Sequence, residues 1–120
     1  VLFTGYIRND ILPKDFDRFS VACYLSLSES FGVSALEAMS CNCPVVASDA
    51  DGFKEVVENG VTGIIVPKYD YKAAADAIQI FIDDPSKIIT MGAAGRERVS
   101  ELYQWSDNVD TMISIYKSIL

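Results

Sequence analysis

Short apolar runs alternate along the chain with segments whose apolar residues recur at helical spacing. The runs cover residues 1–5, 22–27, 44–48 and 62–66. Nearly continuous apolar runs of this length are typical of strands in a parallel sheet that is covered on both faces. The pattern therefore predicts four strands.

Helices are predicted between and after these strands. Residues 53–58 form a short helix between the third and fourth strands. Three longer helices follow: Asp70 caps the first, Asp84-Pro85 starts the second and Ser106 caps the third. We expect their apolar stripes to face the core. The stripes are Tyr71, Ala74, Ala75, Ile78 and Ile82, then Ile88, Met91 and Val99, and finally Val109, Met112, Ile113, Tyr116 and Leu120.

The order strand, tight loop, helix, strand forms a βαβ unit. The predicted fold class is α/β, a Rossmann-like parallel sheet with flanking helices and C-terminal helices. In open sheets of this kind, the loop at the carboxyl end of a strand is the usual ligand crevice. No repeat, low-complexity run or linker interrupts the sequence, so we expect residues 1–120 to form a single domain.

Two glutamates eight positions apart, Glu29 and Glu37, bracket the predicted turn from strand to helix. A helix that opens near Gly32 directs free backbone N–H groups into the crevice, where they favour an anion such as a diphosphate. Glu37 lies just over one turn further along, so its carboxylate can accept hydrogen bonds from two vicinal sugar hydroxyls. Glu29 approaches from the other side. Each charge-assisted hydrogen bond contributes about 1.5–3 kcal/mol, so loss of Glu37 is expected to weaken binding severely.

The residues around these glutamates follow a specific order. They are Ser28, Glu29, Phe31-Gly32, Glu37-Ala38-Met39 and Pro44-Val45-Val46-Ala47. This order resembles the E-x7-E signature of the retaining glycosyltransferases of the GT-B fold, group 1 (family 4) type. The resemblance continues through Gly52, Glu55-Val56-Val57, residues 59–67 and Trp105-Ser106, and thus covers essentially all of the chain.

The resemblance implies a binding site for a nucleotide-diphosphate-sugar donor. In that family the second glutamate binds the ribose and the first lies beside the transferred sugar, which assigns a ribose-binding role to Glu37 and a catalytic position to Glu29. The other donor-binding residues are Ser30, Phe31, Gly32 and Val33. Ser30 has the alternative role of a helix cap. The family requires neither a metal nor another cofactor.

The fold implied by the resemblance is the distal part of the donor-binding domain of a GT-B enzyme. Such an enzyme transfers a sugar to an acceptor hydroxyl with retained anomeric configuration, in polysaccharide or glycoconjugate synthesis. The domain that binds the carbohydrate or lipid-linked acceptor is expected outside residues 1–120. Two departures stand out: Asn42 replaces a common glycine but tolerates the left-handed conformation, and Asp51 replaces the first of two glycines often found in the acceptor-side loop.

Composition removes several other classes of function. The formal net charge of −7 argues against nucleic-acid binding and leaves no basic face for anionic lipid. No run approaches the roughly 20 apolar residues of a membrane span, and no charged leader indicates a signal peptide. Without histidine, the chain holds no Ser-His-Asp or Cys-His nucleophile system. Three cysteines, expected as buried thiols, favour a cytoplasmic protein. Contact with the inner face of the membrane is expected only through regions outside residues 1–120.

Two alternatives stay open at the level of sequence. Asp49 and Asp51 match the Asp-x-Asp by which another class of glycosyltransferases holds a divalent metal, although turn chemistry also explains them. Activity lost with a chelator and restored by manganese would favour the metal. The second alternative is a non-catalytic flavodoxin-like receiver or nucleotide-binding module. A receiver needs an acidic cluster near its first strand, where this chain has Thr4-Gly5-Tyr6.

The isolated 120 residues are expected to bind donor poorly and to turn over nothing. In the family, an arginine and a lysine neutralise the donor diphosphate, and no residue of this chain matches them, so much of the electrostatic stabilisation of the leaving group is missing. A transfer assay of the isolated chain beside the full-length protein checks this expectation, and turnover by the isolated chain contradicts it.

Overall fold

A parallel three-stranded sheet forms the centre of the computed structural model, which describes residues 1–120. The strands are β1 (Ala22–Tyr24), β2 (Val45–Ser48) and β3 (Gly63–Val66), in the order β1-β2-β3. Helix α2 (Val33–Ser40) connects the first two strands and α3 (Asp51–Val56) connects the last two. The two crossovers make consecutive βαβ units, so the predicted α/β class is confirmed.

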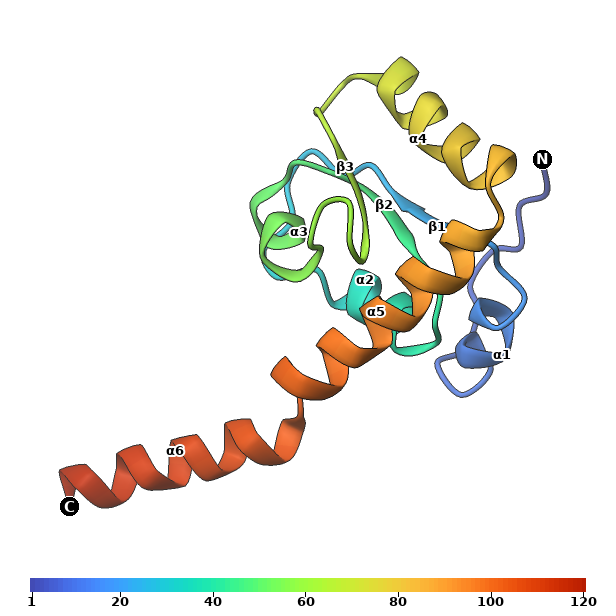
Figure 1. The fold of residues 1–120 in the computed structure, drawn as a ribbon. Coiled ribbons are helices and arrows are strands. Elements are labelled where there is room, and N and C mark those ends of the chain that lie inside the picture. The colour runs from blue at the N-terminus through green and yellow to red at the C-terminus, as the bar shows by residue number, and fades with distance from the viewer.

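The remaining helices flank and extend this sheet. They are α1 (Leu12–Phe16), α4 (Tyr71–Asp83), α5 (Ser86–Leu102) and α6 (Trp105–Ile119). Helices α2 and α3 cover one face, and α5 packs across α2 on the same side, whereas α4 covers β2 and β3 from the other face (Figure 1). The sheet is therefore the middle layer of three.

The central strand β2 explains why its sequence is apolar throughout. Val45 and Ala47 point into the core beneath α2 and α3, while Val46 points toward α4. Successive side chains alternate between the faces of a strand, and both faces are covered here. All four residues of β2 are buried, as the continuous apolar run predicts.

The prediction of a strand over residues 1–5 is wrong. This segment makes no backbone hydrogen bond to the sheet, and Leu2 and Phe3 are 85% and 92% exposed. A strand needs a neighbour to satisfy its N–H and C=O groups, and within this chain none lies beside the segment. An apolar run alone does not supply that neighbour.

The predicted apolar stripes of two helices are also wrong in part. On α4 the buried face consists of Ala74, Ala77 and Phe81, and its two small alanines let the helix lie close to β2 and β3. The predicted stripe residues Tyr71, Ala75 and Ile82 are exposed instead.

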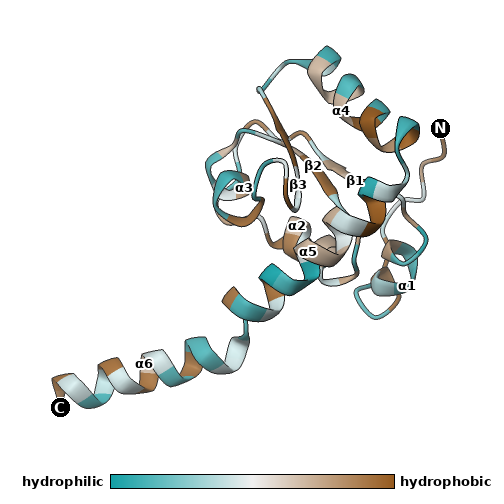
Figure 2. Cartoon of the chain, in the orientation of Figure 1, coloured by the Kyte–Doolittle hydropathy of each residue, from teal (hydrophilic) through white to brown (hydrophobic).

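Helix α6 begins at Trp105, without a cap from Ser106, and buries no residue. It extends away from the sheet, and both apolar and polar residues lie on its surface (Figure 2). Its apolar stripe stays exposed because the helix does not pack against the rest of the chain.

Helix α5 behaves as predicted, with Ile88, Met91 and Val99 half-buried. The predicted short helix starts at Asp51 instead of Phe53 and ends at Val56.

The three thiols differ in burial. Cys43 is buried, and burial raises its thiol pKa to about 11, so it stays protonated at neutral pH. Cys41 is half-buried. Cys23 is exposed, contrary to prediction. It lies on the edge strand β1, and α4 covers only β2 and β3 on that face of the sheet.

Helix α5 approaches the turn that ends α2 at backbone distance. Asn42 in that turn has a φ of 57°, the left-handed conformation that the sequence predicts. A Cβ atom added at Gly92 would overlap the Asn42 carbonyl oxygen, whereas one added at Gly95 would lie 3.4 Å from the Met39 side chain, an ordinary contact. The two glycines therefore have different roles in the same helix.

Gly92→Ala is expected to lower the free energy of unfolding by about 1–3 kcal/mol, because α5 must move away from the Asn42 turn. Gly95→Ala is the matched control, and it is expected to leave stability unchanged or to raise it by up to about 1 kcal/mol through better helix propensity. Urea unfolding of the purified protein measures both, and equal effects of the two substitutions would contradict the proposed close approach.

Candidate donor site at the amino end of helix α2

The candidate site is the loop that leaves β1 and enters α2. Gly32 is the N-cap of α2 and has a φ of 89°, which an L side chain rarely adopts. A Cβ atom there would also lie 3.0 Å from Val56 and 3.2 Å from Phe53, both on α3. The chain therefore turns sharply into α2, where the sequence predicts the helix to open.

The half-buried side chain of Glu29 turns back onto this loop. Its Oε1 accepts a hydrogen bond from the Gly32 amide at 3.1 Å and a longer one from the Phe31 amide at 3.4 Å. A carboxylate at a helix amino end is favoured by the positive end of the helix dipole. Glu29 thus holds two of the amides assigned to the donor, and no side chain caps the first turn, so the Val33 and Ser34 amides carry no such partner.

Glu37 lies one turn further along α2, with an exposed side chain. Beneath it, the Tyr24 hydroxyl donates a hydrogen bond to the Ser34 carbonyl at 3.0 Å. The pKa of Tyr24 is raised, chiefly by burial, and the negative charge of Glu37 contributes to the shift. Glu37 borders a cavity of about 90 Å³ together with Asn9, Leu12, Pro13, Phe16, Ser40 and Cys41. Glu29 does not line this cavity.

The other predicted site residues lie on the outer side of the loop. Ser30 is exposed and makes no capping hydrogen bond, so its alternative role as a helix cap is wrong. Phe31 and Val33 are about half exposed, at 46% and 56%. The structure therefore brings Glu29, Phe31 and Gly32 together and leaves Glu37 on a separate part of the helix surface.

The loop is supported from behind by the start of α3. The Gly52 amide donates a hydrogen bond to the Glu29 carbonyl at 2.9 Å, and a Cβ atom at Gly52 would lie 2.6 Å from the Phe31 nitrogen. Residue 52 must therefore lack a side chain for α3 to touch the loop. Sequence reasoning noted Gly52 only as part of a motif and missed this contact.

The Asp-x-Asp pair has partners within the protein. Asp49 accepts a hydrogen bond from the Lys68 amide at 2.9 Å, and Asp51 forms an ion pair with Lys54 at 2.9 Å, which lowers the pKa of Asp51. No group of three or more His, Cys, Asp or Glu side chains is placed to hold a metal ion. Turn and helix-end contacts account for both carboxylates.

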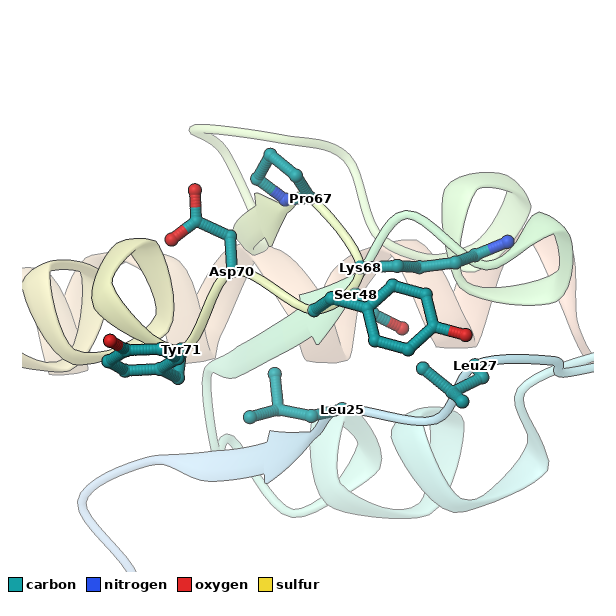
Figure 3. Close-up of a pocket in the computed structure, with 8 residues that line it drawn as sticks. Leu25, Leu27, Ser48, Pro67, Lys68, Asp70 and Tyr71 are labelled. Atoms are coloured by element: carbon teal, nitrogen blue, oxygen red, sulfur yellow. The ribbon is translucent and has the colours of Figure 1, made fainter.

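A second cavity of about 130 Å³ lies at the carboxyl edge of the sheet, where β1, β2 and β3 end. Leu25 and Leu27 form one wall, and Ser48 and the segment from Pro67 to Tyr71 form the rest (Figure 3). It contains none of the predicted site residues.

A three-stranded parallel sheet with helices on both faces defines a Rossmann-like α/β domain. The sequence profile of the family described as "Glycosyl transferases group 1" matches residues 1–98. The chain belongs to this family.

Known relatives agree with this assignment. The chain is 39% identical over 99 residues to the D-inositol 3-phosphate glycosyltransferase of Kribbella flavida, covering 82% of the chain and 23% of the relative. Sucrose-phosphate synthase from Thermosynechococcus elongatus superposes with a TM-score of 0.94 at 37% identity, covering 99% and 30%. Anabaena Alr3699/HepE, solved in complex with UDP and glucose, superposes with a TM-score of 0.83 at 30% identity, covering 95% and 31%.

The chain thus spans less than a third of the length of these relatives. It corresponds to part of a C-terminal GT-B domain, as the sequence resemblance predicts. None of its helices combines the length and the apolar character needed to span a bilayer.

Proposed function

We propose that this chain is the distal part of the donor-binding domain of a retaining glycosyltransferase that uses a nucleotide-diphosphate-sugar. The observation that carries the proposal is the amino end of α2, where Glu29 is bound to the loop amides and Glu37 follows one turn later. The relative solved with UDP and glucose supports a nucleotide-sugar donor of this type.

Each group has a distinct role in the proposal. The uncapped Val33 and Ser34 amides and the helix dipole hold the diphosphate, and Glu37 accepts hydrogen bonds from the ribose hydroxyls. Glu29 lies beside the transferred sugar in an orientation fixed by the Gly32 amide. The acceptor oxygen bonds to the anomeric carbon on the face from which the diphosphate departs, so the configuration is retained. The acceptor hydroxyl proton passes to the departing diphosphate, whose charge is stabilised electrostatically.

The rest of the proposal concerns the longer protein. Metal-independent transfer to a carbohydrate or lipid-linked acceptor requires the acceptor domain and the basic residues expected outside this chain. Polysaccharide or glycoconjugate synthesis at the cytoplasmic side is the setting that the resemblance implies.

Glu37→Gln is expected to weaken nucleotide binding by about 10- to 100-fold, because the ribose loses a charge-assisted acceptor worth about 1.5–3 kcal/mol. UDP, GDP and ADP are titrated calorimetrically into the full-length protein, and the nucleotide that binds is then tested with the variant. Glu97→Gln is the control, since Glu97 is exposed and makes no hydrogen bond or ion pair. Equal affinity of Glu37→Gln and wild type would overturn the ribose assignment.

Glu29→Gln is expected to separate binding from turnover. The glutamine carbonyl oxygen still accepts from the Gly32 amide, so nucleotide affinity changes little, while removal of the negative charge beside the sugar lowers kcat by about 100-fold. Steady-state kinetics and calorimetry on the same preparation distinguish the two effects. An unchanged kcat would show that the Glu29 charge has no part in the reaction.

A further inference from the structure

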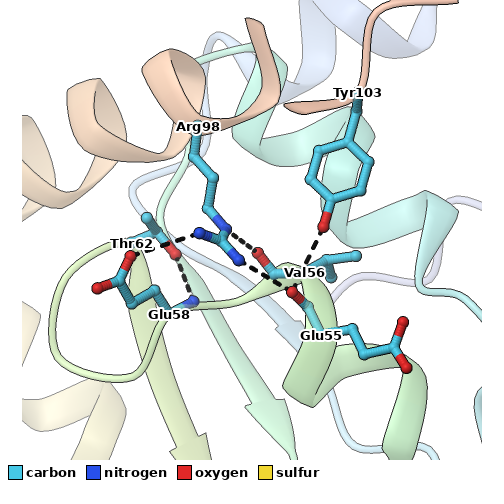
Figure 4. A network of polar contacts seen from close by, with 6 residues as sticks. All are labelled: Glu55, Val56, Glu58, Thr62, Arg98 and Tyr103. Atoms are coloured by element: carbon cyan, nitrogen blue, oxygen red, sulfur yellow. Dashed lines mark hydrogen bonds and ion pairs between the residues drawn. The ribbon is translucent and has the colours of Figure 1, made fainter. Parts of the chain in front are cut away.

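Two side chains from the end of α5 and the residues just after it contact α3 (Figure 4). Arg98 donates from Nε to the Val56 carbonyl and from Nη2 to the Glu55 carbonyl, both at 3.0 Å, and its Nη1 lies 3.5 Å from Glu58 Oε2. Its side chain is only 26% exposed. The guanidinium group therefore occupies the carboxyl end of α3.

Helix α3 depends on such contacts because it has only six residues. A helix this short does not persist on its own in water, and its last carbonyls have no partner within the helix. The planar guanidinium fork reaches two adjacent carbonyls at once and compensates the negative end of the helix dipole. A lysine ammonium group at position 98 has no planar fork with which to reach both carbonyls.

Both ends of α3 support the donor loop, Gly52 near its amino end and Val56 at its carboxyl end. Gly52 contacts Glu29 and Phe31 through backbone atoms, and Val56 lies against Gly32. A displacement of α3 therefore moves the amides that orient the Glu29 carboxylate.

Tyr103 contacts both α3 and the loop. Its hydroxyl donates to the Glu55 carbonyl at 3.4 Å. Its ring meets the Phe31 ring edge-to-face, with 6.1 Å between centroids. This geometry is one that aromatic pairs prefer. Tyr103 is thus a second link from the end of α5 to the same loop.

We infer that Arg98 and Tyr103 are positioning residues that hold the α3 end and the Phe31 ring, so that the loop amides and Glu29 keep the geometry needed for the donor. This inference rests on the proposed function. Neither residue borders the cavity beside Glu37, so both act through α3 and the loop. Arg98 lies more than 40 residues from Glu55 and Val56 in the sequence, so analysis of local motifs does not reveal these contacts.

The main test is Arg98→Met in the full-length protein, with Arg98→Lys as the conservative variant. Both are titrated with UDP and GDP well below their unfolding temperatures. Arg98→Met removes the two hydrogen bonds to the Glu55 and Val56 carbonyls, and it is expected to raise the nucleotide dissociation constant and the donor KM by about tenfold. Arg98→Lys is expected to recover only part of this loss. Lys72→Met, which breaks a surface ion pair with Asp76 on α4, is the matched control and should bind as wild type.

A purely structural role gives a different result. The unfolding temperature of Arg98→Met then falls while the dissociation constant and KM of the folded protein stay at wild-type values, and this outcome overturns the inference. Glu37→Gln is measured in parallel. If Glu37→Gln also binds normally, the proposed donor site itself is wrong, whereas weak binding by Glu37→Gln with normal binding by Arg98→Met rejects only the positioning role.

Tyr103 provides an independent test that does not depend on Arg98→Met folding. Tyr103→Phe keeps the ring against Phe31 and loses only the 3.4 Å hydrogen bond, so less than a twofold change in donor KM is expected. Tyr103→Leu also loses the aromatic contact, and an increase of about three- to tenfold in donor KM is expected. Equal, wild-type KM values for both variants would overturn the role of Tyr103.

Discussion

The hydrogen bond from the Gly52 amide to the Glu29 carbonyl joins the two crossovers of the sheet. It links the loop after β1 to the helix after β2 at 2.9 Å, and it is only accessible because residue 52 has no side chain. Backbone groups packed this closely do not shift independently. The shape of the candidate site therefore depends on where α3 lies as much as on the E-x7-E sequence itself.

Charged side chains stabilise the ends of the helices in this arrangement. Glu29 compensates the positive end of α2, and Arg98 compensates the negative end of α3. Asp70 caps α4 in the same way, through a 2.8 Å hydrogen bond from the Ala73 amide. Four carboxylates, those of Glu29, Asp49, Asp70 and Asp84, thus accept hydrogen bonds from backbone amides.

Sequence reasoning succeeded where the determinant is local and failed where it is distant. The apolar run of β2, the left-handed turn at Asn42 and the opening of α2 at Gly32 follow from neighbouring residues, and all three predictions are confirmed. The opening run and the stripe of α6 are apolar without a partner inside this chain, so their sequences suggested burial that the structure does not contain. The Arg98 contacts could not be predicted because they end on backbone carbonyls, which carry no residue signature.

The size of the cavity beside Glu37 limits what this chain contributes to a site. A volume of about 90 Å³ accommodates a few water molecules, whereas small-molecule pockets commonly measure about 300–1,000 Å³. In the proposed function, the two glutamates and the amides of α2 orient the donor by direction and charge without enclosing it. The chain covers only 23–31% of the relatives compared above, so in the proposed function the enclosing walls belong to the rest of the protein. A site divided in this way binds tightly only when its orienting half is already rigid, because freezing the loop on binding would cost affinity. That requirement gives the contacts behind the loop their importance.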